Sequence, residues 1–212
     1  MKLLTKPILQ FKISLIDSKP LIWRRIQIVE SASFYDLHVA IQDAMGWEDY
    51  HMHQFIIYTG STKKTTQRTC IGIPDDDMGD DMGDDSNLAG WETKIVDYLG
   101  GNEKRKIIYE YDFGDSWEHS VEFEGYFDKD HSVKKYPICC DGEMACPPED
   151  SGGTWGYYDM LDAVNDKNHP NHAETLEWLG DKFNPEVFDK TTVKFHNPKT
   201  RLKEFLKHSD WV

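Results

Sequence analysis

The sequence predicts an α+β fold: an antiparallel sheet built from hairpins, an N-terminal strand–strand–helix–strand unit and a helical C-terminal third. Two observations support this prediction. Apolar and polar residues alternate over several stretches between residues 8 and 123, which is the period of half-buried strands. Beyond residue 153, capping residues precede segments with helical apolar spacing. A chain of 212 residues is long enough for a core, and we expect one domain, residues 1–212.

The N-terminal unit combines three strands and one helix. Its elements are expected at residues 8–16, 21–29, 34–45 and 51–58. Ser33 is placed to cap the helix, with Asp36 three residues later as a capping box, and Gly46 is placed to end it. These segments therefore predict a small unit in which the helix covers a hairpin and a third strand.

A central hairpin follows, with arms at residues 109–113 and 117–123. A three-residue loop would pair Phe113 with Trp117 and Tyr111 with His119, so that both apolar rows share one face. That face would be aromatic, with His119 embedded in it. The opposite face would carry the acidic residues Glu110, Asp112, Glu118 and Glu122.

The C-terminal third has three helical segments. Thr154 can cap a helix through about Asn165, and a second helix is expected at 170–179. Asn197-Pro198 starts the last helix, because a capping side chain precedes proline at the first helical position. We expect these helices to pack on the sheet.

The net charge of −14 bears on partners and location. Seven aspartates between Asp75 and Asp85 supply half of it, and residues 74–90 are predicted to form a flexible acidic loop. Because a chain with this much negative charge repels phosphate backbones, nucleic acid is disfavoured as a partner. No apolar run is long enough to span a membrane, and the N-terminal residues lack a signal peptide's apolar segment, so we expect a cytoplasmic protein.

The cysteines are candidate metal ligands. Cys139 and Cys146 lie seven residues apart with Cys140 between them, and thiolates together with His119 or another histidine could bind zinc. The alternatives are free thiols buried in a turn and a redox-active disulfide.

Histidines and carboxylates supply further candidates. His51 and His53 are expected on one strand face, with His38 on the preceding helix, an arrangement that suits either metal ions or hydrogen-bonded core groups. Glu149 and Asp150 stand in a proline- and glycine-rich turn before a helix, where they favour a cation or helix capping.

Together these motifs resemble one family over about residues 8 to 205. The matching segments are Ile22-Trp23-Arg24-Arg25, Leu37-His38 to Trp47, His51-Met52-His53-Gln54-Phe55, Tyr109 to His119, and Cys139 to Gly153. The chain resembles the root-inducing (Ri) plasmid open-reading-frame-three-like family, whose members are often labelled TnpR proteins. The resemblance implies a single α+β unit and an uncharacterised activity. Many members carry a further cysteine where this chain has Ser151.

Three hypotheses about function follow. The first is a non-enzymatic binding or adaptor domain for an unknown protein or small-molecule ligand, with the aromatic hairpin as its surface. Its candidate ligand-binding residues are Asp112, Asp115, Trp117, His119, Glu149 and Asp150. The alternative is a metal-dependent hydrolase or nuclease associated with mobile elements, which would use the same polar groups with Cys139 and Cys146. The third, DNA handling, rests on the family label. The hydrolase hypothesis predicts that the polar groups converge in one pocket, whereas the binding-domain hypothesis predicts an apolar groove.

Overall fold

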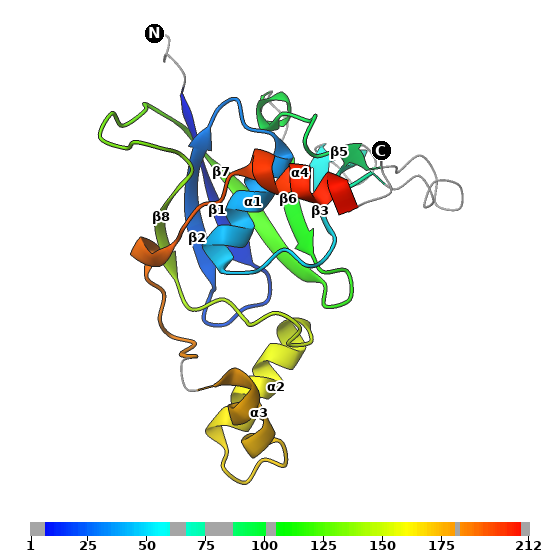
Figure 1. Cartoon of the computed structure of the whole chain (residues 1–212), viewed down its shortest axis with the longest axis vertical. Helices are drawn as coiled ribbons and strands as arrows, with labels where there is room; N and C mark the ends of the chain where they lie inside the picture. The colour runs from blue at the N-terminus through cyan, green and yellow to red at the C-terminus, as the bar shows by residue number, and fades with distance from the viewer. Residues whose placement is uncertain (1–6, 60–66, 75–86, 101–104, 181–182, 209–212) are drawn as a thin grey trace.

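The architecture is seen in a computed structural model, which describes residues 7–59, 67–74, 87–100, 105–180 and 183–208. Across these ranges the α+β class is confirmed: eight strands form one mostly antiparallel sheet, accompanied by four α-helices (Figure 1). The predicted acidic loop at 74–90 lies for the most part at 75–86, outside the described residues.

The sheet joins segments from most of the chain. Its strands are β1 (Ile8–Leu15), β2 (Trp23–Val29), β3 (His53–Thr59), β4 (Gln67–Gly72), β5 (Leu88–Ala89), β6 (Arg105–Tyr111), β7 (Trp117–Phe127) and β8 (Ile138–Glu143). The spatial order is β5-β4-β3-β6-β7-β1-β2-β8. Neighbours are antiparallel except β4 and β5, which are parallel.

The helices, like the strands, are numbered in the order of the chain. They are α1 (Phe34–Met45), α2 (Gly153–Asn165), α3 (His172–Leu179) and α4 (Pro198–His208), with short 3₁₀ helices η1 (Ile95–Tyr98) and η2 (Lys190–Thr192). Helix α1 lies across the sheet with α4 beside it, whereas α2 and α3 extend beyond one end of the sheet (Figure 1).

The core lies between α1 and one face of the sheet. Register places Phe55 of β3 opposite Tyr109 of β6, and Tyr109 opposite His119 of β7. All three side chains are fully buried, and the Phe55 and Tyr109 ring centroids are 4.9 Å apart. Because side chains alternate along a strand, this register puts every second residue of β3, β6 and β7 under the helix.

Helix α1 has the ends that its sequence predicts. The Ser33 side chain accepts a hydrogen bond from the Asp36 backbone N–H, and the Asp36 carboxylate accepts one from the Ser33 N–H. Gly46 ends the helix with φ of 97°, a left-handed conformation that glycine adopts without strain. The helix therefore stops sharply, and the following loop turns back over the core.

The central hairpin differs from its predicted pairing by two residues. Tyr111 pairs with Trp117 and Tyr109 with His119, so the loop spans residues 112–116 rather than 114–116. Asp112 leaves the strand with φ of 57°, and its carboxylate accepts hydrogen bonds from the backbone N–H groups of the loop. A shift of two residues keeps Tyr109, Tyr111, Trp117 and His119 on their predicted face, so the aromatic face survives. Phe113, which was predicted to pair with Trp117, lies in the loop and is 38% exposed. Asp112, however, does not join Glu110 on the acidic face.

Three strands of the sheet, β4, β5 and β8, were not predicted from the sequence. The segment that was interpreted as a cysteine-containing turn contains β8, which pairs with β2 at the edge of the sheet. Its composition, Ile-Cys-Cys-Asp-Gly-Glu, lacks the apolar alternation of an inner strand, because neither face of this edge strand is fully buried.

Only part of the C-terminal region packs on the sheet. Tyr157 and Met160 of α2 belong to the buried core, whereas α3 has no buried residue. The expectation that the C-terminal helices pack on the sheet therefore holds for one face of α2 and does not hold for α3.

Trp117→Ala should lower the free energy of unfolding by about 3–5 kcal/mol, because the side chain is fully buried and its removal leaves a cavity. Urea denaturation measures this. Trp155→Ala is the control: Trp155 is 82% exposed, and its loss should cost no more than about 0.5 kcal/mol. A loss below about 1 kcal/mol for Trp117→Ala would contradict its role in the core.

Candidate metal centre

Three loops bring carboxylates to one imidazole. His51 lies in the loop between α1 and β3, Asp112 begins the β6–β7 turn, and Glu149 and Asp150 precede α2. The His51 Nε2 atom is 3.0 Å from Asp150 Oδ1, 3.6 Å from Asp112 Oδ2 and 3.8 Å from Glu149 Oε2. Three of the six candidate ligand-binding residues therefore meet around His51. We call these four residues the His51 cluster.

Two of these carboxylates are fixed through one oxygen each. Glu149 Oε1 accepts hydrogen bonds from the Glu48 N–H at 2.7 Å and the Tyr111 hydroxyl at 3.0 Å. Asp112 Oδ1 accepts them from the N–H groups of Gly114 at 3.0 Å and of the following residue at 3.3 Å. The second oxygen of each carboxylate is the one that faces His51.

Backbone conformation helps to aim these groups. Asp112 and Asp150 have φ values of 57° and 55°, in the left-handed region that few residues other than glycine adopt. Asp49, in the loop that carries His51, has φ of 64°. Such conformations cost free energy and gather at functional sites, so three in one neighbourhood suggest a site rather than a plain turn.

The remaining predicted ligand-binding residues lie elsewhere. Asp115 Oδ2 accepts a hydrogen bond from the Gly152 N–H at 3.0 Å, which ties the hairpin turn to the start of α2. There the Asp115 carbonyl approaches Gly153 so closely that a Cβ would lie 2.4 Å away. Trp117 and His119 are core residues, with 1% and 0% of their surface exposed.

Cys139 and Cys146 lie outside both groups of potential metal ligands found in the described residues. Cys139 is a half-buried residue of β8, and its thiol donates to the Asp141 carbonyl at 3.5 Å. Burial raises the pKa of Cys139 to about 11 and that of Cys146 to about 12, an effect that nearby Arg24 partly offsets. Among the described residues, neither cysteine belongs to a group of three or more potential ligands.

A second group of potential ligands lies beside the first. It consists of His38 on α1, Asp49 in the loop and His53 at the start of β3. His51 and His53 were expected on one strand face, but β3 begins at His53, so the two imidazoles serve different groups. Asp49 was not predicted as a ligand, since an aspartate two residues before a histidine carries no distinctive signal.

A pocket of about 520 Å³ adjoins both groups. It is lined by His38 of α1, by Asp49 and His51 of the loop, by His53 of β3 and by Arg201 of α4. A volume in this range is typical of small-molecule sites.

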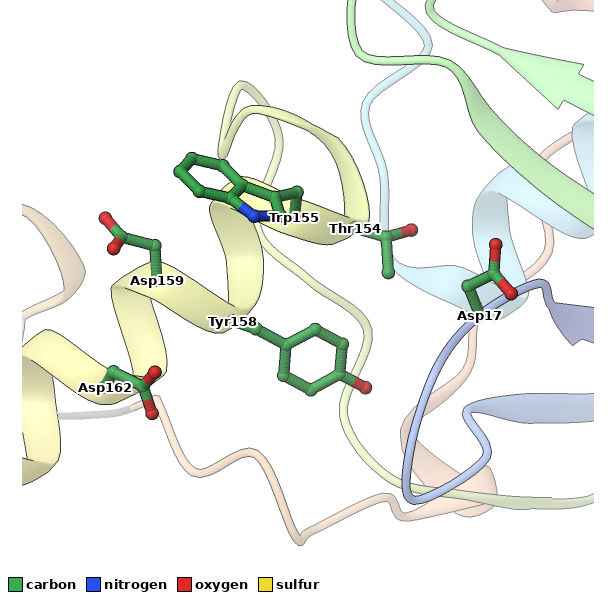
Figure 2. A pocket seen from close by; sticks show the side chains of 6 residues that line it. All are labelled: Asp17, Thr154, Trp155, Tyr158, Asp159 and Asp162. Atoms are coloured by element: carbon green, nitrogen blue, oxygen red, sulfur yellow. The ribbon is translucent and has the colours of Figure 1, made fainter.

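Another depression lies at the α2 surface, between that helix and the β1–β2 turn, and has a volume of about 410 Å³. Figure 2 shows the Tyr158 ring extending from α2 toward the turn that carries Asp17. The Tyr158 hydroxyl accepts a hydrogen bond from the Lys19 N–H, which fixes α2 to that turn. The lining contains no histidine and none of the predicted site residues.

The fold and site define an α+β domain in which carboxylates and imidazoles converge at a pocket. A model of the plasmid pRiA4b ORF-3-like protein family matches residues 7–192, and the chain belongs to that family. The uncharacterized protein y4hQ of Sinorhizobium fredii is 31% identical over 173 residues, which are 82% of this chain and 81% of that protein. A crystal structure of a protein of unknown function from Methanosarcina mazei Go1 superposes with a TM-score of 0.77 and 39% identity, over 90% of this chain and 99% of that one.

The comparisons confirm the family that the sequence motifs indicated. The relatives are themselves uncharacterized, so they assign no activity. Within the described ranges, no helix is long and apolar enough to cross a membrane.

The stability of the protein should fall in acid because of His119. Burial lowers the pKa of His119 to about 4 from its usual 6.5, so the folded state holds the neutral ring. Because the pKa of His119 is lower in the folded state than in the unfolded state, the neutral ring stabilises the folded protein above about pH 6.5. This stabilisation is lost as the pH falls from about 6.5, the unfolded pKa, to about 4, the folded pKa. The loss approaches about 3 kcal/mol.

Urea denaturation at about pH 7 and about pH 4.5, compared between the wild type and His119→Leu, measures this loss. The wild type should lose about 2–3 kcal/mol more than the variant, in which no proton can be taken up at this position. Equal losses in the two proteins would show that His119 does not carry the effect.

Proposed function

We propose that the protein is a metal-binding domain that holds a hard divalent cation at the His51 cluster and a small-molecule ligand in the adjoining pocket. The observation that supports this proposal is the arrangement of Asp112 and Glu149, each fixed by hydrogen bonds through one oxygen and free at the other. Both free oxygens face His51 Nε2, which is also in contact with Asp150 Oδ1 at 3.0 Å, and the buried Glu149 Oε2 atom has no hydrogen-bond partner within the described structure.

Charge favours a cation in this place. Three carboxylates surround a single imidazole, so the cluster stays negative even when His51 is protonated, and the chain as a whole carries −14. Like charges at such distances repel, and a divalent ion would relieve that repulsion. Three oxygen ligands with one imidazole suit Mn²⁺ better than a softer ion, because carboxylates are hard ligands.

The pocket supports binding of a small molecule rather than of a macromolecule. Its volume suits a small molecule, and the net charge still disfavours nucleic acid as the partner. We also propose a cytoplasmic location, which is supported by Cys139, Cys140 and Cys146, since all three are thiols without a disulfide.

Mn²⁺ should bind to the purified, chelator-treated protein, and Asp112→Asn and Asp150→Asn should each weaken binding at least about tenfold. Both substitutions remove a charged ligand and keep the left-handed backbone, which asparagine tolerates. Electron paramagnetic resonance of free Mn²⁺ measures the affinity. Glu118→Gln is the matched control, because it removes the same charge from an exposed position on β7 and should leave the affinity unchanged. An affinity that is equal in all four proteins would refute the site.

A second candidate is a metal-dependent hydrolase, since the polar groups converge beside a pocket instead of pointing apart. A metal-bound water next to a carboxylate can attack an ester or phosphoester. This function predicts Mn²⁺-dependent cleavage of bis(p-nitrophenyl) phosphate or p-nitrophenyl acetate that Asp112→Asn abolishes. Mn²⁺ binding without turnover of either substrate would leave the binding domain as the function.

A further inference from the structure

The second group of potential ligands has the form of a buried metal site. The His38 and His53 rings stack with centroids 3.4 Å apart and planes within 4° of parallel, and the two residues are 0% and 2% exposed. Asp49 Oδ1 lies 2.8 Å from His38 Nε2. One potential ligand atom from each residue lies within 4.8 Å of the other two.

One buried nitrogen atom in this group, His53 Nδ1, has no hydrogen-bond partner among the described parts of the chain. His38 Nε2 makes no hydrogen bond, and its polar contact is the Asp49 Oδ1 atom at 2.8 Å. A buried polar atom without a partner costs free energy, and native structures tolerate few of them.

A chain of hydrogen bonds behind His38 can select the form of the ring that binds metal. The Tyr109 hydroxyl lies 2.8 Å from His38 Nδ1 and 2.8 Å from the amide nitrogen of Gln42. The other amide atom, Gln42 Oε1, is buried without a partner. A half-turn of this amide lets Oε1 accept the Tyr109 O–H, and the Tyr109 oxygen then accepts the His38 Nδ1–H. His38 Nε2 is left with its lone pair directed toward Asp49.

We infer that His38, Asp49 and His53 bind a divalent transition metal of the Zn²⁺ or Fe²⁺ class, with Tyr109 as the positioning residue that fixes the tautomer of His38. Two histidines and one carboxylate are a recurrent ligand set for such ions and leave coordination positions open. All three ligands line the pocket of about 520 Å³, so an open position would be accessible to a ligand there. This inference goes beyond the proposed function and uses none of the residues of the His51 cluster.

The two sites differ in ligand chemistry. The His51 cluster offers three carboxylates and one imidazole, whereas this site offers one carboxylate and two imidazoles. Imidazole suits Zn²⁺, Fe²⁺ and Co²⁺, while carboxylate-rich sets suit Mn²⁺ and Mg²⁺. Each site can therefore be titrated with its own probe.

Co²⁺ is the probe for the buried site, because its visible absorption reports its coordination. The chelator-treated protein should bind one Co²⁺ with an absorption band that Zn²⁺ displaces. Asp49→Asn should weaken Co²⁺ binding about 100-fold or more, beyond the effect of outer-shell changes. This substitution keeps both the side-chain shape and the left-handed backbone. Asp150→Asn, which removes a ligand of the His51 cluster, should leave Co²⁺ binding unchanged.

These outcomes separate the two sites. Loss of Mn²⁺ binding in Asp150→Asn together with full Co²⁺ binding supports both proposals. If the wild type binds Co²⁺ but no Mn²⁺, only the proposal of a cation at the His51 cluster is refuted. A wild type that binds no Co²⁺, or an Asp49→Asn protein that binds it normally, overturns the buried site.

Tyr109→Phe tests the positioning role. It should weaken Co²⁺ binding about 10–100-fold, as loss of an outer-shell partner does. In ¹⁵N-correlated spectra of the metal-free wild type, His38 should carry its proton on Nδ1, and the variant should lose that single tautomer. Tyr35→Phe is the matched control, since its buried ring lies 5.5 Å from the His38 ring yet makes no hydrogen bond to His38 Nδ1. Equal affinities and an unchanged tautomer in Tyr109→Phe would show that Tyr109 has only a packing role.

Discussion

The register between β3, β6 and β7 is the constraint on which the rest of the molecule depends. It aligns Phe55, Tyr109 and His119 across three strands and buries them under α1. A slip of one residue would turn this face to solvent and would move the Tyr109 hydroxyl away from His38. The same register ends β6 at Tyr111, so that Asp112 enters the turn and reaches His51. The fold and the candidate site therefore both depend on the register of these three strands.

The loop between α1 and β3 links this core to the two sites. Gly46 ends α1, and within the next seven residues the chain supplies Asp49, His51 and His53. The segment before His53 is not a strand, so these residues do not share one face: Asp49 and His53 belong to the buried group and His51 to the other. The loop is held at several points, for example by the Tyr111 hydroxyl, which accepts the Tyr50 N–H and donates to Glu149. An aromatic core residue thereby connects the two groups.

Elements with strong local sequence signals could be predicted from the sequence, whereas features that depend on tertiary contacts could not. The capping box at Ser33 and the alternation along β6 and β7 predicted α1 and the aromatic face, because both signals are local. The hairpin loop was predicted two residues too short, because Asp112 leaves the strand through contacts with its own loop that periodicity does not show. Asp112, Glu149 and Asp150 were identified by residue type, whereas Asp49 was missed because only the fold brings it to His38.

The placement of charge explains why these groups are more than an acidic surface. Exposed carboxylates separate and hydrate, but Glu149 is only 15% exposed and is fixed by two hydrogen bonds beside His51. Holding it there costs desolvation and repulsion that a folded chain does not retain without compensation. Arg201 offsets part of the charge on the other side, where its guanidinium lies 3.5 Å from Asp49. Around His51 a single imidazole faces three carboxylates, and this imbalance is the reason for proposing a cation there.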